Sequence, residues 1–183
     1  ICLVKDRYTT RKKQELDFST VRKFLDEAVS MGVLNVAFSG GEILIREDFE
    51  DIYVYAIKKG CLVSIYSNIT LLDKRKLDLL QKYPPDRMQV SIYGLSKETY
   101  EKVTRVHGSF ELFKKNLTLL RERCIRLILH FPLCSSYEKD YKRMEETYFN
   151  PNKRDDKITQ GPEAVVKKLI SALEIPHPKS HYF

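Results

Sequence analysis

Apolar residues between positions 17 and 131 alternate between a helical spacing and short continuous runs. The first amphipathic segment has apolar residues at the i, i+3, i+4, i+7 and i+8 positions of one helix face, which predicts a helix. It carries Val21, Phe24, Leu25, Ala28 and Val29. Asp17 or Ser19 is expected to cap its amino end, and Gly32 is expected to end it.

The same alternation continues along the chain and predicts a parallel sheet. We expect strands at residues 33–38, 61–67, 88–94 and 125–131. Helices are expected at residues 49–59, 73–82, 97–103 and 110–123. The strands mostly lack alternating polar residues, which is typical of a sheet covered by helices. Helices and strands that alternate with short turns favour an α/β fold with parallel strands.

The length of 183 residues favours one domain. Within it we expect a polar loop over residues 1–16, β/α repeats over 17–131, and weakly patterned C-terminal helices and a tail over 132–183.

Composition excludes several classes of protein. Hydrophobic residues make up 43% and charged residues 31%, as in ordinary globular proteins. No apolar run reaches the roughly 18 to 20 residues of a membrane span, and no signal-peptide pattern is present, so we expect a cytoplasmic protein. The net charge of +7 is spread along the helices, which does not favour a nucleic-acid partner. Four cysteines without a C-x-x-C pair indicate free thiols.

Small and hydrogen-bonding residues follow three of the predicted strands. They are Gly40, Gly41 and Glu42 in "FSGGE", Ser67 and Asn68 in "YSN", and Ser91 in "VSIYG". The carboxyl ends of parallel strands form one rim, where α/β proteins bind ligands. Paired glycines can present backbone groups to a ligand, and Glu42 can accept from an ammonium group or a ribose hydroxyl. Taken alone, "GG" after a strand is more typical of a tight turn than of a ligand site, and no phosphate-loop motif is present.

This ordered set of motifs, continued by "ETYEKVTRVHGSFELFKKNL", resembles the radical S-adenosylmethionine (radical SAM) superfamily. It is most similar to the peptide-maturing branch, whose members often carry a SPASM or Twitch domain. The resemblance covers residues 16–131. It implies a partial (β/α)6 TIM-type barrel with parallel strands, from which the N-terminal strand is missing or truncated.

The resemblance also implies a site for SAM. Gly40, Gly41 and Glu42 match the segment that holds the methionyl amino group in the family. Ser67, Asn68 and Ser91 match positions that contact the ribose or the carboxylate. Two departures stand out: Ile43 replaces the usual proline, and Thr104 aligns with an arginine of many members. Arg105 is therefore kept as a candidate for the SAM carboxylate.

The iron–sulfur ligands depart most from the family. A 4Fe-4S cluster is implied by the resemblance, held by three cysteines in C-x-x-x-C-x-Φ-C. Only Cys2 fits the end of that motif, as if the first strand and two ligands were missing, and one thiolate is not enough for a cluster. Cys61 and Cys124 precede strands on the opposite rim and are interpreted as structural thiols. Cys134 and His130 lie nearer the ligand rim, with a structural role as the plainer interpretation for each.

Three hypotheses follow. The first is a radical SAM enzyme that cleaves SAM reductively and uses the 5′-deoxyadenosyl radical on a ribosomally made peptide, with flavodoxin or ferredoxin as external electron donor. The second is a cluster-free or truncated homologue that binds SAM or a partner. The third is an unrelated RNA-binding α/β domain, which explains the charge but not the motif series.

Overall fold

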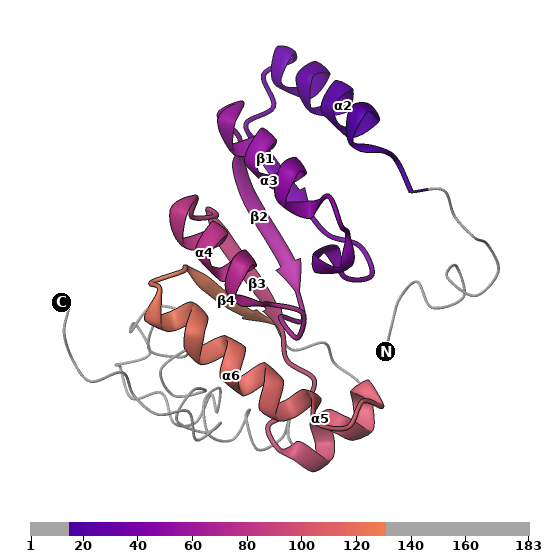
Figure 1. Ribbon diagram of the computed structural model, residues 1–183, viewed down its shortest axis with the longest axis vertical. Coiled ribbons are helices and arrows are strands. Elements are labelled where there is room, and N and C mark those ends of the chain that lie inside the picture. Colours follow the sequence, from indigo (N-terminus) through magenta and orange to yellow (C-terminus); the bar gives the residue numbers. More distant parts are fainter. Residues whose placement is uncertain (1–14, 131–183) are drawn as a thin grey trace, which may run out of the picture.

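The computed structural model describes residues 15–130, in which helices and parallel strands alternate (Figure 1). The helices are α2 (Phe18–Ser30), α3 (Phe49–Lys58), α4 (Lys74–Lys82), α5 (Lys97–Thr104) and α6 (Ser109–Glu122), with a 3-10 helix η1 (Ile43–Ile45). The strands are β1 (Asn35–Phe38), β2 (Leu62–Ser67), β3 (Arg87–Ser91) and β4 (Leu127–His130). No helix in this part of the chain is long and apolar enough to cross a bilayer.

Each helix and strand predicted within residues 15–130 is present, with small differences at the ends. The prediction that the third strand reaches residue 94 is wrong, because β3 ends at Ser91 and Gly94 has a φ of 157° as the chain turns into α5. The helix η1 directly after Glu42 was not predicted. Predictions for Cys2, Cys134 and residues 132–183 lie outside the described residues.

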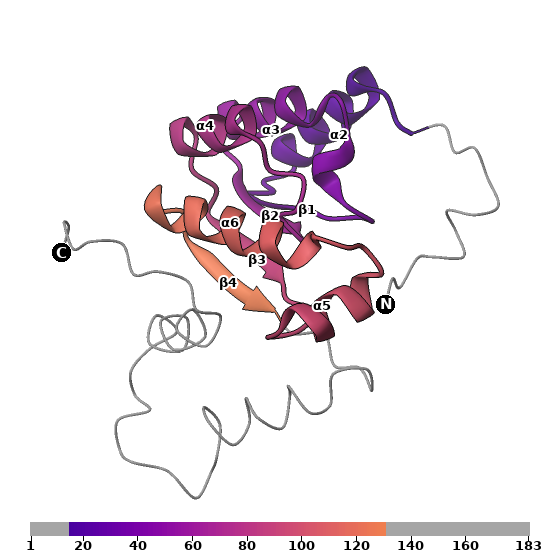
Figure 2. The same cartoon turned by 60° about the horizontal axis from the view of Figure 1, so that its bottom comes forward.

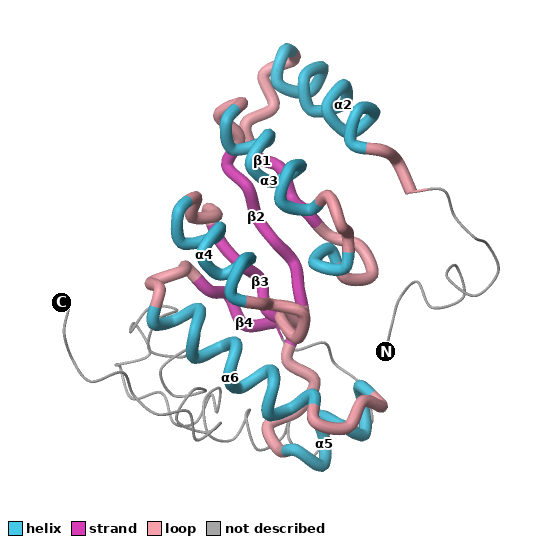
Figure 3. Tube along the Cα trace, in the orientation of Figure 1, coloured by secondary structure: helices cyan, strands magenta, loops and turns pink. Residues whose placement is uncertain are grey.

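The four strands form one parallel sheet in the order β1-β2-β3-β4. Each connection between neighbouring strands contains helix, which confirms the predicted α/β class (Figure 3). The strand register pairs Ser67 with Val90 and Ser91 with His130. Within residues 15–130 the sheet is open, with β1 and β4 at its two edges, so the described part is a partial and not a closed barrel.

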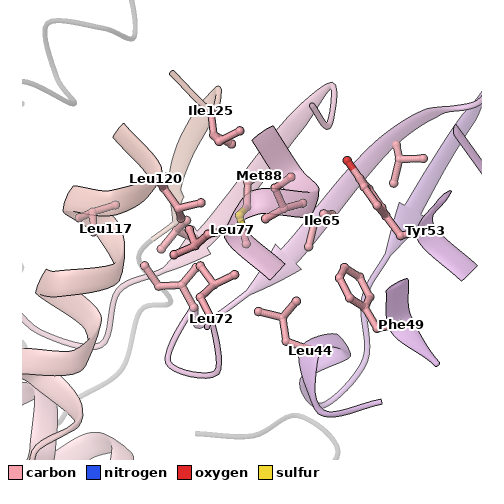
Figure 4. Packing of buried hydrophobic residues seen from close by; sticks show 14 of the residues in the cluster. Leu44, Phe49, Tyr53, Ile65, Leu72, Leu77, Met88, Leu117, Leu120 and Ile125 are labelled. Atoms are coloured by element: carbon pink, nitrogen blue, oxygen red, sulfur yellow. The ribbon is translucent and has the colours of Figure 1, made fainter. Parts of the chain in front are cut away.

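The helices lie over one face of the sheet (Figure 2). Val63 and Ile65 of β2 and Val90 of β3 point into this layer and are fully buried. Figure 4 shows the resulting core, in which side chains of the helices pack against those of the strands. Tyr66 is 40% exposed and Ile128 36% exposed on the opposite face, which no described helix covers.

The turns that lead into β1, β2 and β4 form the amino edge of the sheet and share one helix-ending motif. Gly32, Gly60 and Cys124 have φ of 86°, 85° and 54°. In each case the next N–H donates to a carbonyl five residues earlier, as in a Schellman motif. The three bonds are Val33 to Ala28 (3.0 Å), Cys61 to Ala56 (3.1 Å) and Ile125 to Leu120 (3.1 Å). Two of the three left-handed positions are the glycines predicted to end their helices.

At the amino end of α2, the Oδ1 of Asp17 accepts from the backbone N–H of Thr20 at 2.7 Å. This identifies Asp17 as the N-cap, one of the two residues that the sequence offered.

Candidate functional site

Glu42 joins the loops that follow β1 and β2. Its Oε1 accepts from the backbone N–H of Leu44 (3.1 Å) and from the hydroxyl of Ser67 (2.8 Å). Its Oε2 accepts from the backbone N–H of Asn68 (2.9 Å). One donor follows β1 and the other two lie at the end of β2. Together they hold the carboxylate in one orientation at the carboxyl edge of the sheet.

Two exposed glycines directly precede Glu42, which is itself partly exposed. Gly40 has a φ of 154°, and a Cβ placed on it would meet no atom within 4 Å. Both Gly40 and Gly41 are exposed. A carboxylate oxygen has two lone pairs, and Oε2 uses one of them to accept from the N–H of Asn68. A carboxylate beside the exposed backbone of two glycines presents hydrogen-bond acceptors that suit the ammonium group of an amino acid, which is the ligand that the family resemblance implies for the GGE motif.

A set of short-range bonds shapes the loop after β2. The hydroxyl oxygen of Ser67 also accepts from the N–H of Ile69 (2.8 Å), and Oδ1 of Asn68 accepts from the N–H of Thr70 (2.9 Å). Ile69 itself has a φ of 57° and a fully buried side chain. A β-branched residue in the left-handed region is strained, so the surrounding contacts must hold the loop in this conformation.

One of these contacts comes from α6. The side-chain amide of Asn116 is in the core and donates to the carbonyl of Ile69 (2.8 Å) and to that of Leu72 (3.3 Å). The sequence analysis did not single out Asn116. A polar residue on the apolar face of a helix, between Phe113 and Leu117, is the signal that would have found it.

Ser91 lies on a different face of the sheet from Ser67. The register sets Ser67 beside Val90, and successive side chains of a strand alternate between faces. Ser91 therefore shares the face that no described helix covers with Tyr66 and His130. Glu42, Ser67 and Asn68 are thus joined by hydrogen bonds, whereas Ser91 stands at the end of the next strand on the other face.

The connection from β3 to α5 is tightly packed. A Cβ on Gly94 would lie 2.7 Å from the backbone nitrogen of Tyr100, so only glycine fits there. The hydroxyl of Tyr100 is buried and has no hydrogen-bond partner among residues 15–130. Burial raises the pKa of Tyr100, and the nearby Tyr93 and the charge of Glu42 raise it further. Tyr100 therefore stays neutral beside the site.

Arg105 caps the carboxyl end of α5 with a φ of 58°, and its side chain is exposed. The Thr104 hydroxyl, at the position of the family arginine, donates back to the carbonyl of Tyr100 (3.0 Å). No hydrogen bond within residues 15–130 joins Arg105 to Glu42, and its contact with a ligand stays a prediction.

Arg46 fastens the segment before α2 to the loop that carries Glu42. Its Nε and Nη2 donate to the two carboxylate oxygens of Asp48, each at 2.9 Å. Nη2 also donates to the carbonyl of Leu16 at 2.9 Å, and Glu15 lies 3.4 Å from Nη1. Hydrogen bonding to Asp48 raises the pKa of Arg46. The sequence analysis did not identify this contact.

The described residues do not provide an iron–sulfur site. Cys61 is buried and Cys124 exposed, both as free thiols at the amino edge of the sheet, away from Glu42. Residues 15–130 contain no group of three or more His, Cys, Asp or Glu side chains placed to hold a metal. Cys2 lies outside this range. The oxygen acceptors at Glu42 suit the ammonium group of an amino acid, whereas no step through a cluster can be derived from these residues.

Comparison with known proteins decides the family. Residues 1–146 match the family described as the Radical SAM superfamily. The chain belongs to the radical SAM superfamily. This confirms the resemblance inferred from the motif series and removes the hypothesis of an unrelated α/β domain.

The relatives are enzymes by name. The chain is 27% identical over 124 residues to the PqqA peptide cyclase of Granulibacter bethesdensis, a match that covers 68% of this chain and 33% of the cyclase. It is 28% identical over 128 residues to the Fe-coproporphyrin III synthase of Methanosarcina barkeri, covering 70% of this chain and 32% of the synthase. The chain therefore spans about a third of the length of these relatives.

A solved structure supports the fold. Native anSMEcpe with bound AdoMet superimposes with a TM-score of 0.61 at 18% identity, over 76% of this chain and 42% of that protein. At this identity the likeness concerns the fold alone, and it agrees with the partial TIM-type barrel expected from the sequence.

Proposed function

We propose that this chain is the SAM-binding core of a radical SAM enzyme. In this proposal Glu42 accepts from the methionyl ammonium group of SAM, and the backbone of Gly40 and Gly41 completes the contact. The observation that carries it is the orientation of the Glu42 carboxylate by Ser67 and Asn68, which fixes its direction before a ligand arrives. Preorganisation of this kind lowers the ordering cost of binding.

The remaining site residues have distinct parts in the proposal. The side-chain oxygen of Asn68 faces Thr70, which leaves its Nδ2 donor for a ribose hydroxyl. Ser91 contacts SAM from the face that no described helix covers, and Ser67 contributes mainly by holding Glu42. Arg105 pairs with the SAM carboxylate, which requires its exposed side chain to turn toward the carboxyl edge.

A 4Fe-4S cluster, if bound, would supply the electron for the reductive cleavage of SAM to methionine and a 5′-deoxyadenosyl radical. We propose Cys2 as one of its ligands, and flavodoxin or ferredoxin as the electron donor in the cytoplasm. The residues described here contribute the orientation of SAM, not the cluster.

We propose a peptide as substrate. The likeness to a PqqA peptide cyclase supports it, and Tyr66 and Ile128 offer exposed apolar surface for a peptide on the face that no described helix covers. The similar identity to a coproporphyrin synthase makes a tetrapyrrole the competing class. A cluster-free SAM-binding or partner-binding module is the alternative from a different class of function.

The test uses the full-length parent protein, reconstituted anaerobically with iron and sulfide. We expect an iron-dependent visible absorption band, and 5′-deoxyadenosine after SAM and a reductant are added. Glu42→Gln should abolish 5′-deoxyadenosine formation, whereas Glu47→Gln, an exposed glutamate of the same loop, should not. A parent protein that takes up no iron would overturn the enzyme. Binding of SAM without iron would support the cluster-free module.

A further inference from the structure

We propose that Asn116 of α6 is a positioning residue for the SAM site. Its side-chain amide holds the loop after β2 in the conformation that orients the Glu42 carboxylate. This inference rests on the proposed function and adds a residue to it that lies in the core, away from any ligand.

The first step is the contact between α6 and the loop. Asn116 is 2% exposed, and its Nδ2 donates to the carbonyl oxygens of Ile69 and Leu72 at 2.8 and 3.3 Å. These carbonyls lie 47 and 44 residues earlier in the chain. One amide therefore closes both ends of a short loop from the helix side.

The second step is the strain in that loop. Ile69 has a φ of 57°, a region that β-branched residues rarely adopt. Its side chain is fully buried and its carbonyl accepts from Asn116 and, more weakly, from the N–H of Leu72 at 3.3 Å. Without the amide, two buried carbonyls lose a donor and the loop loses a contact that opposes its relaxation.

The third step leads from the loop to the ligand site. The N–H of Asn68 donates to Oε2 of Glu42 at 2.9 Å, directly before the strained residue. The hydroxyl of Ser67 bonds both Oε1 of Glu42 and the N–H of Ile69. A change in the backbone at Ile69 therefore moves two of the three donors that orient the carboxylate, and only the N–H of Leu44 lies outside this loop.

Packing alone does not require an amide at this place. The neighbouring core positions of α6 are Phe113, Leu117 and Leu120, all fully buried. Leucine has the same branching and number of side-chain heavy atoms as asparagine, is somewhat larger, and has a higher helix propensity, so an apolar residue would suit the helix better. What asparagine adds is the pair of hydrogen bonds to the loop.

The experiment measures SAM affinity of the reconstituted full-length protein by calorimetry. Asn116→Leu should weaken SAM binding about tenfold, because the loop relaxes and Glu42 is no longer held. Leu120→Ala is the matched control, since it also perturbs the core side of α6 but touches neither carbonyl. It should lower the melting temperature at least as much and leave SAM affinity unchanged.

A double-mutant cycle tests the route through Glu42. In a Glu42→Gln background, Asn116→Leu should weaken SAM binding less than twofold further, because its effect is already lost. A full tenfold loss in that background, or equal SAM affinity of Asn116→Leu and the wild type, would overturn the inference.

Amide hydrogen exchange of the wild-type protein supplies a measurement that needs no variant. On addition of SAM, the amides of Asn68 to Leu72 should gain protection together. SAM binding without such protection would also overturn the role of Asn116 while leaving the proposed function intact. A wild-type protein that binds no SAM would instead sink the proposed function itself.

Discussion

The amino and carboxyl edges of the same sheet are built in different ways. At the amino edge, Gly32, Gly60 and Cys124 end helices through bonds that span five residues. At the carboxyl edge, Glu42 is held by donors 25 and 26 residues away, and Asn116 reaches across 47 residues. The three helix-ending turns at the amino edge are closed by local bonds, whereas the Glu42 network at the carboxyl edge depends on contacts between distant segments. We therefore expect the functional site at the carboxyl edge, where these long-range polar contacts fix the position of a carboxylate.

The largest effect should come from Glu42. Glu42→Gln removes the charge that faces the ligand and replaces one acceptor with a donor, so SAM affinity should fall about 100-fold. The Tm should fall as well, since the N–H of Asn68 loses a charged partner. Calorimetric titration with SAM measures the first effect and thermal unfolding the second. If Glu47→Gln weakened binding equally, the carboxyl-edge network would not be the cause.

Ser67 tests whether the network stabilises the fold as well as the site. Ser67→Ala removes a buried hydroxyl that donates to Glu42 and accepts from Ile69, which should lower the free energy of unfolding by about 1–3 kcal/mol. Denaturant titration measures the loss.

Ser64→Ala, on the other face of the same strand, is the control and should change stability by less than about 0.5 kcal/mol. Equal losses at both serines would remove the distinction between the two sites.

The amino edge should respond in stability alone. Gly60→Ala places a Cβ at a φ of 85° and should lower stability by about 1 kcal/mol. Cys124→Gly should raise it by about 0.5–1 kcal/mol, because glycine relieves the left-handed strain at the same motif. Neither change should alter SAM affinity. A change in SAM binding at either position would show that the two edges are coupled.

The smallest effect concerns pH. Asp73 caps α4, and its hydrogen bonds to the side chain and backbone of Lys76 lower its pKa. A carboxyl whose folded pKa is depressed stabilises the fold above its unfolded pKa. That stability is lost as the pH falls below the ordinary value of 3.8 and through the folded pKa.

Asparagine also caps helices, so Asp73→Asn should keep most of the stability at neutral pH and flatten its decline in acid. Urea midpoints measured between neutral and acidic pH compare the two proteins. If the stability of the variant fell with decreasing pH as steeply as that of the wild type, the decline would come from other carboxyl groups.

The difference between the edges also explains what the sequence could predict. Gly32 and Gly60 were expected to end helices because that signal lies within a few residues. The GGE segment and Asn68 were expected at one rim because parallel strands place their carboxyl ends together, and the hydrogen bonds between them agree.

Contacts that depend on register or on distant segments were not predictable in the same way. The sequence offered Ser67 and Ser91 as equivalent, but the register places them on opposite faces of the sheet. The left-handed Ile69 and the amide of Asn116 make sense only as a pair from separate elements. Cys124 occupies a helix-ending position that is usually taken by glycine, so the sequence lacked the glycine that would have predicted this turn.

Arg46 has a mechanical consequence for the rest of the protein. Its guanidinium donates to the carbonyl of Leu16 and to the carboxylate of Asp48. These hydrogen bonds connect the segment that enters α2 with the loop that follows Glu42. Removal of this one side chain would therefore separate the entry to α2 from the loop that follows Glu42. In this way one side chain joins two segments that α2 and β1 separate in the chain.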